Sequence, residues 1–353
     1  MFSISKHLCF LCTVAISAVM MHHPADAKDN VGVRQIVARS TERGSNLDVT
    51  VWYPAQLGGE QVMLGESIFF VGTPAWRDAP ILEGKFPLVL LSHGAGLAGS
   101  PQALSWIATP LAQQGFVVAA PMHPGNSGRN RSAAETMKIW LRPGDLTETL
   151  DAMERDSFFQ EHLEQGNVGA LGLSMGGGTA LAIAGARINP NLLAGYCDTD
   201  ALNASLCEWV RQSGADLHAM NLQSAGRDNE DKRIRFAMAI DPAPIDVFEF
   251  KSFSGISIPI ELINLGRPNQ IPPTLQASEV AKSIPTASYT TIRDASHYSM
   301  FAECNPGASQ IAESERIGDP ICMDGGGRSR SELHAQLIDM VIAAFNRVLK
   351  AVP

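Results

Sequence analysis

The sequence predicts an α/β fold in which a mostly parallel sheet is covered by helices on both faces. Three observations support this class. Apolar runs without alternation, at 86–92 and 116–121, are typical of strands buried on both faces. Helical patterns lie between successive strand-like runs, as in sheets whose parallel strands are joined by helical crossovers. The stretch 167–186 combines a short apolar strand, a glycine-rich turn and a helix of small residues.

The elements of the first half follow from local patterns. The expected strands occupy 31–39, 47–54, 86–92 and 116–123. Alternation in the second of these predicts a half-exposed antiparallel strand. The expected helices cover 101–114 and 145–165. The first of them should end before Gly115, and the second carries an apolar stripe of Leu146, Leu150 and Met153.

The second half continues the alternation and interrupts it once. The expected strands occupy 167–173, 233–242, 257–266 and 287–297, and the expected helices cover 175–186 and 331–350. About 45 residues separate the helix at 175–186 from the next strand, which is long for a connection without regular structure. We expect residues 187–230 to form an insertion, either a disulfide-clamped cap over a pocket or a surface excursion.

The first 27 residues predict a secretory signal peptide. Lys6 and His7 precede an apolar stretch from Leu8 to Met21, and 25–27 reads Ala-Asp-Ala, which suits a cleavage site. The apolar stretch is too short for a membrane span. We therefore expect an exported protein, periplasmic or secreted, whose single folded domain is 28–353.

Charge and length restrict the class of partner. The net charge is −9, and no basic cluster interrupts the acidic balance, which argues against binding to nucleic acid or to an anionic membrane. No second long apolar stretch follows the first, so we expect no stable membrane anchor after cleavage. A small-molecule or lipid-like partner fits better, and the oligomeric state stays open.

Four of the six cysteines lie outside the predicted signal peptide. They form two pairs that are local in sequence: Cys197 with Cys207, and Cys304 with Cys322. Export permits disulfides, and we expect this local pairing among the three possible connectivities. Four free thiols are the alternative. Neither pair has the spacing of a zinc site.

The most informative motif is Gly172-Leu173-Ser174-Met175-Gly176. It lies between a strand and a helix, which is the context of a nucleophile elbow in the α/β-hydrolase fold. Such a turn strains the serine backbone and exposes its hydroxyl. The helix N-terminus then places N–H groups where an oxyanion would form. A phosphate-binding turn is the alternative, but the stretch has no nucleotide-binding pattern.

A serine nucleophile needs a histidine base and an acid. The chain order of this fold is serine, acid, histidine, and His297 follows the last strand in a loop that can reach Ser174. His93 and His123 end strands but precede the serine. A hydrogen-bonded loop histidine is the structural alternative for His297.

The acid that would orient His297 is expected early in the second half of the chain. The loop after the strand at 257–266 contains Asn269 and no carboxylate, whereas Asp241 ends the strand before it. Asp241 is therefore the predicted acid. Asp246 and Asp294 are weaker candidates, and Asp294 is better suited to brace the loop of His297.

The oxyanion hole requires two N–H donors. Met175 follows the nucleophile and should supply the first. The second is expected from Ala95 in the Ser-His-Gly-Ala-Gly loop after the strand at 86–92. Trp76, Trp106 and Trp140 are candidates for an apolar acyl pocket, although each could equally pack in the core.

The chain resembles serine-dependent α/β-hydrolases grouped around platelet-activating-factor acetylhydrolases and dienelactone-hydrolase-like esterases. The resemblance runs from about Phe86 to Phe301 and rests on five stretches. They are FPLVLLSHGAG, QGFVVAAPMHPGNSG, GLSMGGGTA, AMAIDPAP and ASH. In that group the acid follows the strand after the elbow, which agrees with Asp241, and the oxyanion donor matches Ala95. Dienelactone hydrolases proper use cysteine, so Ser174 argues for ester chemistry.

Some motifs are also similar to bacterial cutinases and polyester hydrolases. Those enzymes place the acid one strand later, where this chain has Asn269, and they lack Ser-His-Gly before the first helix. The sequence thus predicts an exported carboxylic ester hydrolase that acts on short-acyl or lipid-like esters without metal or organic cofactor. A polyester hydrolase, a thioesterase or amidase with the same triad, and a silent binding protein on this fold are the alternatives.

Overall fold

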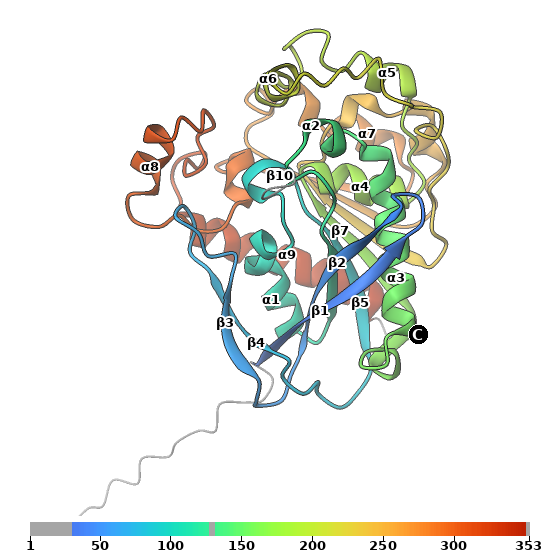
Figure 1. Cartoon of the computed structure of the whole chain (residues 1–353), viewed down its shortest axis with the longest axis vertical. Coiled ribbons are helices and arrows are strands. Elements are labelled where there is room, and N and C mark those ends of the chain that lie inside the picture. Colours follow the sequence, from blue (N-terminus) through green and yellow to red (C-terminus); the bar gives the residue numbers. More distant parts are fainter. Residues whose placement is uncertain (1–29, 127–130, 351–353) are drawn as a thin grey trace, which may run out of the picture.

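The computed structural model describes residues 30–126 and 131–350 (Figure 1). The predicted signal peptide at 1–27 lies outside the described residues. The described chain forms one ten-stranded sheet with helices on both faces, so the predicted α/β class is confirmed.

The strand order across the sheet is β10-β9-β8-β7-β5-β6-β2-β1-β4-β3. The strands are β1 (Val31–Ser40), β2 (Ser45–Pro54), β3 (Glu60–Leu64), β4 (Thr73–Arg77), β5 (Phe86–Ser92), β6 (Val117–Pro121), β7 (Leu163–Leu173), β8 (Ile234–Ile240), β9 (Ile260–Leu265) and β10 (Ala287–Ile292). From β6 to β10 all neighbours are parallel. Their carboxyl ends therefore meet at one edge, which is where ligands bind in such sheets.

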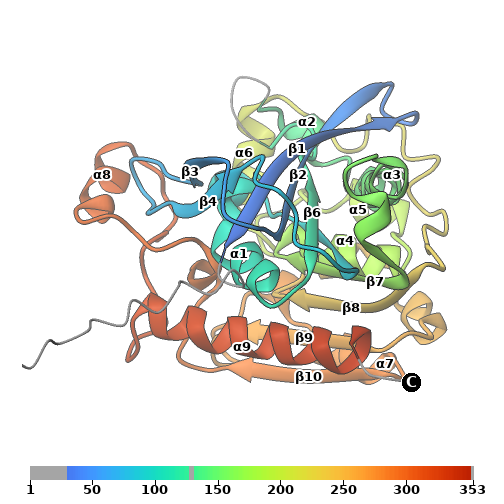
Figure 2. The same cartoon turned by 90° about the horizontal axis from the view of Figure 1, so that it is seen from below.

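Helices cover both faces of the sheet and separate two apolar cores. On one face lie α1 (Ser105–Gln113) and α9 (Arg330–Leu349), and on the other lie α3 (Arg142–Arg155) and α4 (Met175–Ile183) (Figure 2). Shorter helices are α2 (Ala133–Thr136), α5 (Pro190–Ala194), α6 (Ala204–Gln212), α7 (Ser278–Ser283) and α8 (Ala308–Ser314). Burying both faces explains why the central strands are continuously apolar.

Three local expectations differ from the structure. β2 is buried on both faces over its second half, because it pairs with β1 and β6 inside the sheet and is packed against α1. The helix expected over 145–165 is α3, which ends at Arg155 because β7 already begins at Leu163. The β3–β4 hairpin, which pairs with β1, was not predicted at all.

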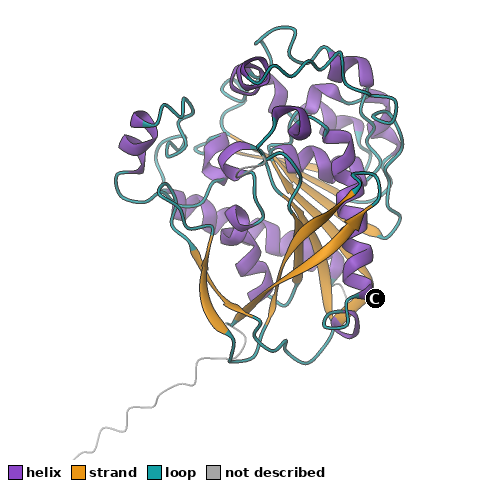
Figure 3. Cartoon of the chain, viewed as in Figure 1, coloured by secondary structure: helices purple, strands orange, loops and turns teal. Residues whose placement is uncertain are grey.

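Residues 187–230 form an insertion of mostly irregular chain at the carboxyl edge of the sheet (Figures 1 and 3). It contains α5 and α6 and the pair Cys197–Cys207, whose Cα atoms are 5.1 Å apart. Cys304 and Cys322 are likewise paired, with Cα atoms 5.9 Å apart. Both pairs match the local connectivity predicted from the sequence.

Peptide mapping of the non-reduced protein should recover both local disulfides, Cys197–Cys207 and Cys304–Cys322. Each Cα–Cα distance lies in the range that a disulfide spans without backbone movement. Mass spectrometry after alkylation without reductant measures this directly. Four alkylated cysteines, or a crossed pairing, would contradict the expectation.

Among the helices of the described residues, none has the length and apolar character needed to span a membrane.

Candidate active site

Ser174 lies in a strained turn between β7 and α4. Its backbone angles are φ 55° and ψ −123°, a region that costs a side chain-bearing residue about 1–3 kcal/mol. Two hydrogen bonds hold this geometry: its N–H donates to the Ile240 carbonyl (2.9 Å), and its carbonyl accepts the Ala243 N–H (3.0 Å). The strand that follows the elbow therefore fixes the orientation of the serine.

Two glycines allow the strand and the helix to approach each other at this turn. A Cβ atom on Gly172 would overlap the Gly176 carbonyl, and a Cβ on Gly176 would overlap the Ser92 carbonyl. Any larger residue would push β7, β5 and α4 apart. The Gly-x-Ser-x-Gly spacing is therefore a packing requirement of the elbow.

His297 lies within hydrogen-bonding distance of Ser174. Its Nε2 is 3.2 Å from Ser174 Oγ, and its Nδ1 is 3.0 Å from Asp241 Oδ2. The His297 side chain is 21% exposed, so a substrate can reach it, whereas Asp241 is fully buried. The structure thus brings the three predicted residues into one hydrogen-bonded line.

The Asp241 carboxylate is oriented by residues at the end of β9. Its Oδ1 accepts hydrogen bonds from the Asn264 side-chain amide (2.8 Å) and from the Leu265 N–H (2.8 Å). Oδ2 is thereby left to face His297. Asn264 is itself held by the Leu275 carbonyl and the Ala277 N–H. Sequence reasoning missed Asn264, which lies inside an apolar strand.

The weaker acid candidates have other partners. Asp246 accepts a hydrogen bond from Thr274 (2.9 Å), and Asp294 forms a two-point ion pair with Arg328 at 2.6 and 2.7 Å. Arg328 holds the pKa of Asp294 below its ordinary value. Asp294 thus braces the loop before His297.

Ala95 and Met175 both line the cavity that contains Ser174. Neither amide donates to another described residue, so both are available to an oxyanion. Met175 is the first residue of α4, where the helix dipole adds positive potential.

His93 determines which way the Ala95 amide points. Its Nδ1–H donates to the Gly94 carbonyl (2.8 Å), and its Nε2 accepts the His123 backbone N–H (3.0 Å). The Gly94 carbonyl and the Ala95 N–H belong to one trans peptide and so point in opposite directions. With the carbonyl held toward the buried ring of His93, the N–H is directed the other way.

A second Ser–His–Asp line lies beneath this loop. His123 contacts Ser92 Oγ (2.9 Å) and Asp145 Oδ2 (2.7 Å), and Arg43 binds Asp145 through two bonds of 2.7 Å each. Ser92 and His123 are fully buried and Asp145 nearly so, which leaves a substrate no access to them. Burial holds the pKa of His123 well below its ordinary value, with Arg142 adding to the shift, so the ring stays neutral.

Arg142 connects this buried network to the loop that carries Ala95. Its guanidinium donates to the His93 carbonyl and to Thr179 Oγ1 on α4 (3.1 Å). Burial lowers the pKa of Arg142 to about 9, so it remains charged at neutral pH. A buried arginine and aspartate on a helix have no signal in sequence that separates them from surface charges.

His334 on α9 packs against the loop that carries His297, which we call the histidine loop. It stacks on Trp106 with ring centroids 3.8 Å apart, and its Nε2–H donates to the Ser299 carbonyl (2.9 Å). Burial lowers the pKa of His334 to about 4 from its ordinary value of 6.5. The unfolded chain therefore binds a proton between these values that the folded chain does not.

The His334→Gln variant should lose less stability in acid than the parent protein. The contribution of His334 to the free energy of unfolding is complete above about pH 6.5. It is lost as pH falls toward about 4, at roughly 1.4 kcal/mol per pH unit. Glutamine can keep a donor to Ser299 and does not titrate. Urea unfolding of both proteins between neutral pH and pH 4.5 measures this, and identical pH profiles would exclude His334 as a contributor.

The triad opens into a cavity of about 450 Å³. The insertion supplies one wall of it through Leu202, Asn203, Ala204, Ser205, Leu206 and Trp209. Asp319 ties this wall to the histidine loop, since it accepts hydrogen bonds from Ser205 Oγ (3.1 Å) and Tyr298 OH (3.0 Å).

The tryptophans expected at an acyl pocket do not line this cavity. Trp140 packs in the core, Trp106 stacks on His334, and Trp76 lies on β4. Trp209 from the insertion lines it instead. Trp209 lies on α6, and the sequence of this helix does not show that it faces the cavity of Ser174.

Comparisons with known proteins support the fold and the family resemblance. Residues 61–154 match the family model of platelet-activating factor acetylhydrolase, isoform II, which confirms the resemblance over this part of the chain. The matched part contains Ser92, Ala95, His123 and Asp145 but none of Ser174, Asp241 and His297. No curated protein matches the sequence.

Solved structures with the α/β-hydrolase fold align with most of the chain. A ferulic acid esterase from Streptomyces cinnamoneus is 19% identical with a TM-score of 0.60, and the alignment covers 92% of this chain and 91% of that one. An acylaminoacyl peptidase bound to a chloromethyl ketone is 11% identical with a TM-score of 0.50. There the alignment covers 92% of this chain and 43% of the peptidase, so this chain spans less than half of that protein.

Proposed function

We propose that this protein is a serine esterase that hydrolyses carboxylic esters through an acyl-enzyme intermediate. The observation that carries the proposal is the line Ser174–His297–Asp241, with contacts of 3.2 and 3.0 Å, at the wall of an accessible cavity. The buried line through Ser92 has the same residue types and similar distances but no access. Accessibility therefore distinguishes the two.

In the first step, Ser174 Oγ attacks the ester carbonyl carbon while His297 Nε2 takes the hydroxyl proton. The carbonyl π electrons move to oxygen, and the resulting oxyanion accepts hydrogen bonds from the Ala95 and Met175 amides. Asp241 keeps the His297 Nδ1–H directed toward itself and stabilises the imidazolium. Collapse of the intermediate breaks the ester C–O bond, and His297 gives its proton to the leaving alcohol.

In the second step, water replaces the alcohol. His297 takes a proton from the water as its oxygen attacks the acyl-enzyme carbonyl, and the same amides hold the second oxyanion. The Ser174 C–O bond then breaks, His297 returns the proton to Ser174, and the carboxylic acid leaves. Every bond change is accounted for by the triad, the two amides and water.

The cavity supports an ester with an apolar acyl or alcohol group. Most of its lining is apolar, with Trp209, Tyr298 and Phe301 presenting aromatic surface. The family description names an acetylhydrolase of platelet-activating factor, and the aligned neighbour is named an esterase of ferulic acid. A thioester or an amide could meet the same atoms, and we prefer an ester because the aligned neighbour is named an esterase.

We further propose that residues 1–27 direct export and that residues 187–230 act as a cap. Two local disulfides support an oxidising compartment. The lining contributed by α6 supports the cap, because a surface excursion would not border the cavity of Ser174.

Labelling with a fluorophosphonate tests the proposal. The parent protein should be modified once, on Ser174, and the Ser174→Ala variant should not react. Hydrolysis of p-nitrophenyl esters from acetate to palmitate, with a matched thioester and anilide, then identifies the reaction. A folded parent protein that neither reacts with the probe nor hydrolyses any of these substrates would show that the site is silent.

A further inference from the structure

A second hollow lies beside the active-site cavity and has no part in the mechanism described above. Its volume is about 410 Å³, and it lies between the loop from β3 to β4 and the short helix that follows the oxyanion loop. Its apolar lining is provided by Ile68, Phe69, Phe70, Leu97, Ala98 and Phe301.

The hollow is directly adjacent to the active-site cavity. Ala98 and Phe301 line both spaces. Aromatic rings lead from one to the other, since Phe70 contacts Phe301 edge-on at 5.8 Å between centroids and Phe301 contacts Tyr298 in the same way at 5.8 Å. Tyr298 follows His297 directly and lies against its ring. A group bound in the hollow would thus be close to the reacting ester.

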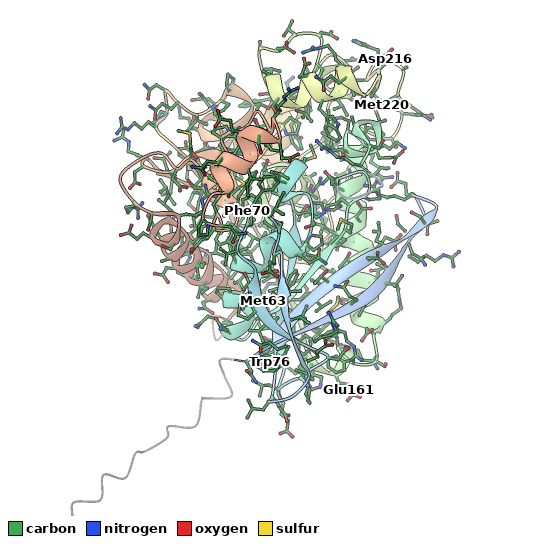
Figure 4. The ribbon with its side chains drawn as sticks, turned by 60° about the vertical axis from the view of Figure 1, so that its left-hand side comes forward. Met63, Phe70, Trp76, Glu161, Asp216 and Met220 are labelled. Carbon is green, nitrogen blue, oxygen red and sulfur yellow. A yellow bond between two sulfur atoms is a disulfide. The ribbon has the colours of Figure 1, made fainter. Side chains whose placement is uncertain are left out.

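The outer wall of the hollow is held in place by backbone pairing. The Val71 N–H donates to the Glu303 carbonyl (2.7 Å), and the Asn305 N–H donates to the Phe69 carbonyl (2.9 Å). Phe70 pairs with Cys304 in an isolated antiparallel bridge, and Figure 4 shows Phe70 on the same side of the molecule as Met63 of β3. The wall is therefore formed before any ligand binds, which lowers the entropic cost of binding.

The chemistry of the lining indicates what the hollow accepts. Ile68 and Leu97 are 61% and 36% exposed, so their apolar side chains are accessible to a ligand at the hollow. Glu66 is the charged residue at the rim and would repel an anionic group. An uncharged alkyl or aryl group gains most from this surface.

We propose that this hollow is a subsite for one apolar end of the ester whose carbonyl lies at Ser174. The inference rests on the proposed esterase function and extends it to the substrate class, uncharged esters with an extended apolar chain on one side of the ester bond. A chain on the other side, or a small group, is accommodated in the cavity under the insertion.

Two isomeric esters test the subsite. Ethyl octanoate and octyl acetate have the same composition, but the long chain is on the acyl side in one and on the alcohol side in the other. Ethyl acetate is the short reference. Acid release in a pH-stat gives kcat/KM for all three with the parent protein and with the double variant Ile68→Ser/Leu97→Ser.

We expect the double variant to lose about tenfold in kcat/KM for one of the two isomers, because roughly two large apolar contacts are removed. The other isomer and ethyl acetate should change little. The isomer that loses identifies which end of the ester occupies the hollow. No change for either isomer, or an equal loss for all three esters, would overturn the subsite.

A matched control uses exposed apolar residues elsewhere. Val37 and Leu192 are 56% and 48% exposed and border neither space, so Val37→Ser/Leu192→Ser removes similar surface. This control should behave as the parent protein does. If it shows the same loss, the effect is general adsorption and the subsite is wrong.

A binding measurement separates the subsite from the esterase function. The Ser174→Ala variant cannot turn over, and calorimetry should show tighter binding of the preferred isomer than of ethyl acetate. Adding Ile68→Ser/Leu97→Ser should remove that difference. If binding follows this pattern while the parent protein hydrolyses nothing, the esterase proposal fails and the subsite stands. If the parent protein hydrolyses the esters but the Ser174→Ala variant binds the long and short esters equally, only the subsite is overturned.

Sedimentation of the same proteins tests whether a second copy of the chain, rather than an ester, occupies the hollow. A second copy of the chain could cover the hollow, in which case the parent protein would be a dimer and the double variant a monomer. That result would overturn the subsite, whereas an unchanged oligomeric state supports it.

Discussion

Asp241→Asn is expected to lower kcat by about 10⁴-fold with little effect on KM. The surrounding donors explain why. Asn264 and the Leu265 N–H both donate to Oδ1, so the oxygen of a new amide would stay with them and its NH₂ would face His297. The His297 Nδ1 must then accept a hydrogen bond, and its proton moves to Nε2. A protonated Nε2 cannot take the proton of Ser174.

The controls for this experiment are the neighbouring carboxylates. Asp246→Asn removes the same charge close to the site and should stay within a few fold of the parent protein, whereas Asp294→Asn, which weakens the brace with Arg328, should lower kcat far less than Asp241→Asn does. Steady-state kinetics on a soluble short ester measures all three variants. If Asp241→Asn remained within about tenfold of the parent, the acid would have to lie elsewhere and the triad as proposed would be wrong.

Ala95→Pro is expected to lower kcat by about 10²–10³-fold, with KM little changed. Proline has no N–H, so the variant loses one of the two donors to the oxyanion, which exists in the transition state and not in the bound substrate. The loss corresponds to about 2.7–4 kcal/mol of transition-state stabilisation.

Ala95→Gly provides the matched comparison, since it removes the same side chain and keeps the N–H. It should retain most of the activity. Thermal unfolding of both variants verifies that the loop change leaves the fold intact. A proline variant that keeps its kcat would assign the second donor to another group.

The elements closest to the chemistry were predictable because their signals are local. Gly172 and Gly176 flank Ser174 where a side chain would overlap the neighbouring backbone of α4 or β5, and the pattern is visible in five residues. His297 and Asp241 followed from chain order and from the absence of a carboxylate at Asn269. The local cysteine pairs followed from short separation, which makes closure of the loop easy.

The groups that position the site were not predictable in the same way. Asn264, His93 and Arg142 act through partners far away in the chain, and each has an ordinary sequence context. His93 was placed near the site, but its hold on the Gly94 carbonyl depends on the His123 backbone, 30 residues later. Whether a polar side chain is buried, and what it contacts there, depends on packing between elements.

The linear order of residues was thus enough to predict the α/β class and to single out Ser174, His297 and Asp241 as candidates, because turn sterics and strand order act over short distances. It could not establish that one Ser–His–Asp line faces a cavity while another is sealed in the core, or that Trp209 rather than Trp106 lines the pocket. Those distinctions arise from which faces are covered when the sheet, the helices and the insertion pack together, and solvent access exists only in three dimensions.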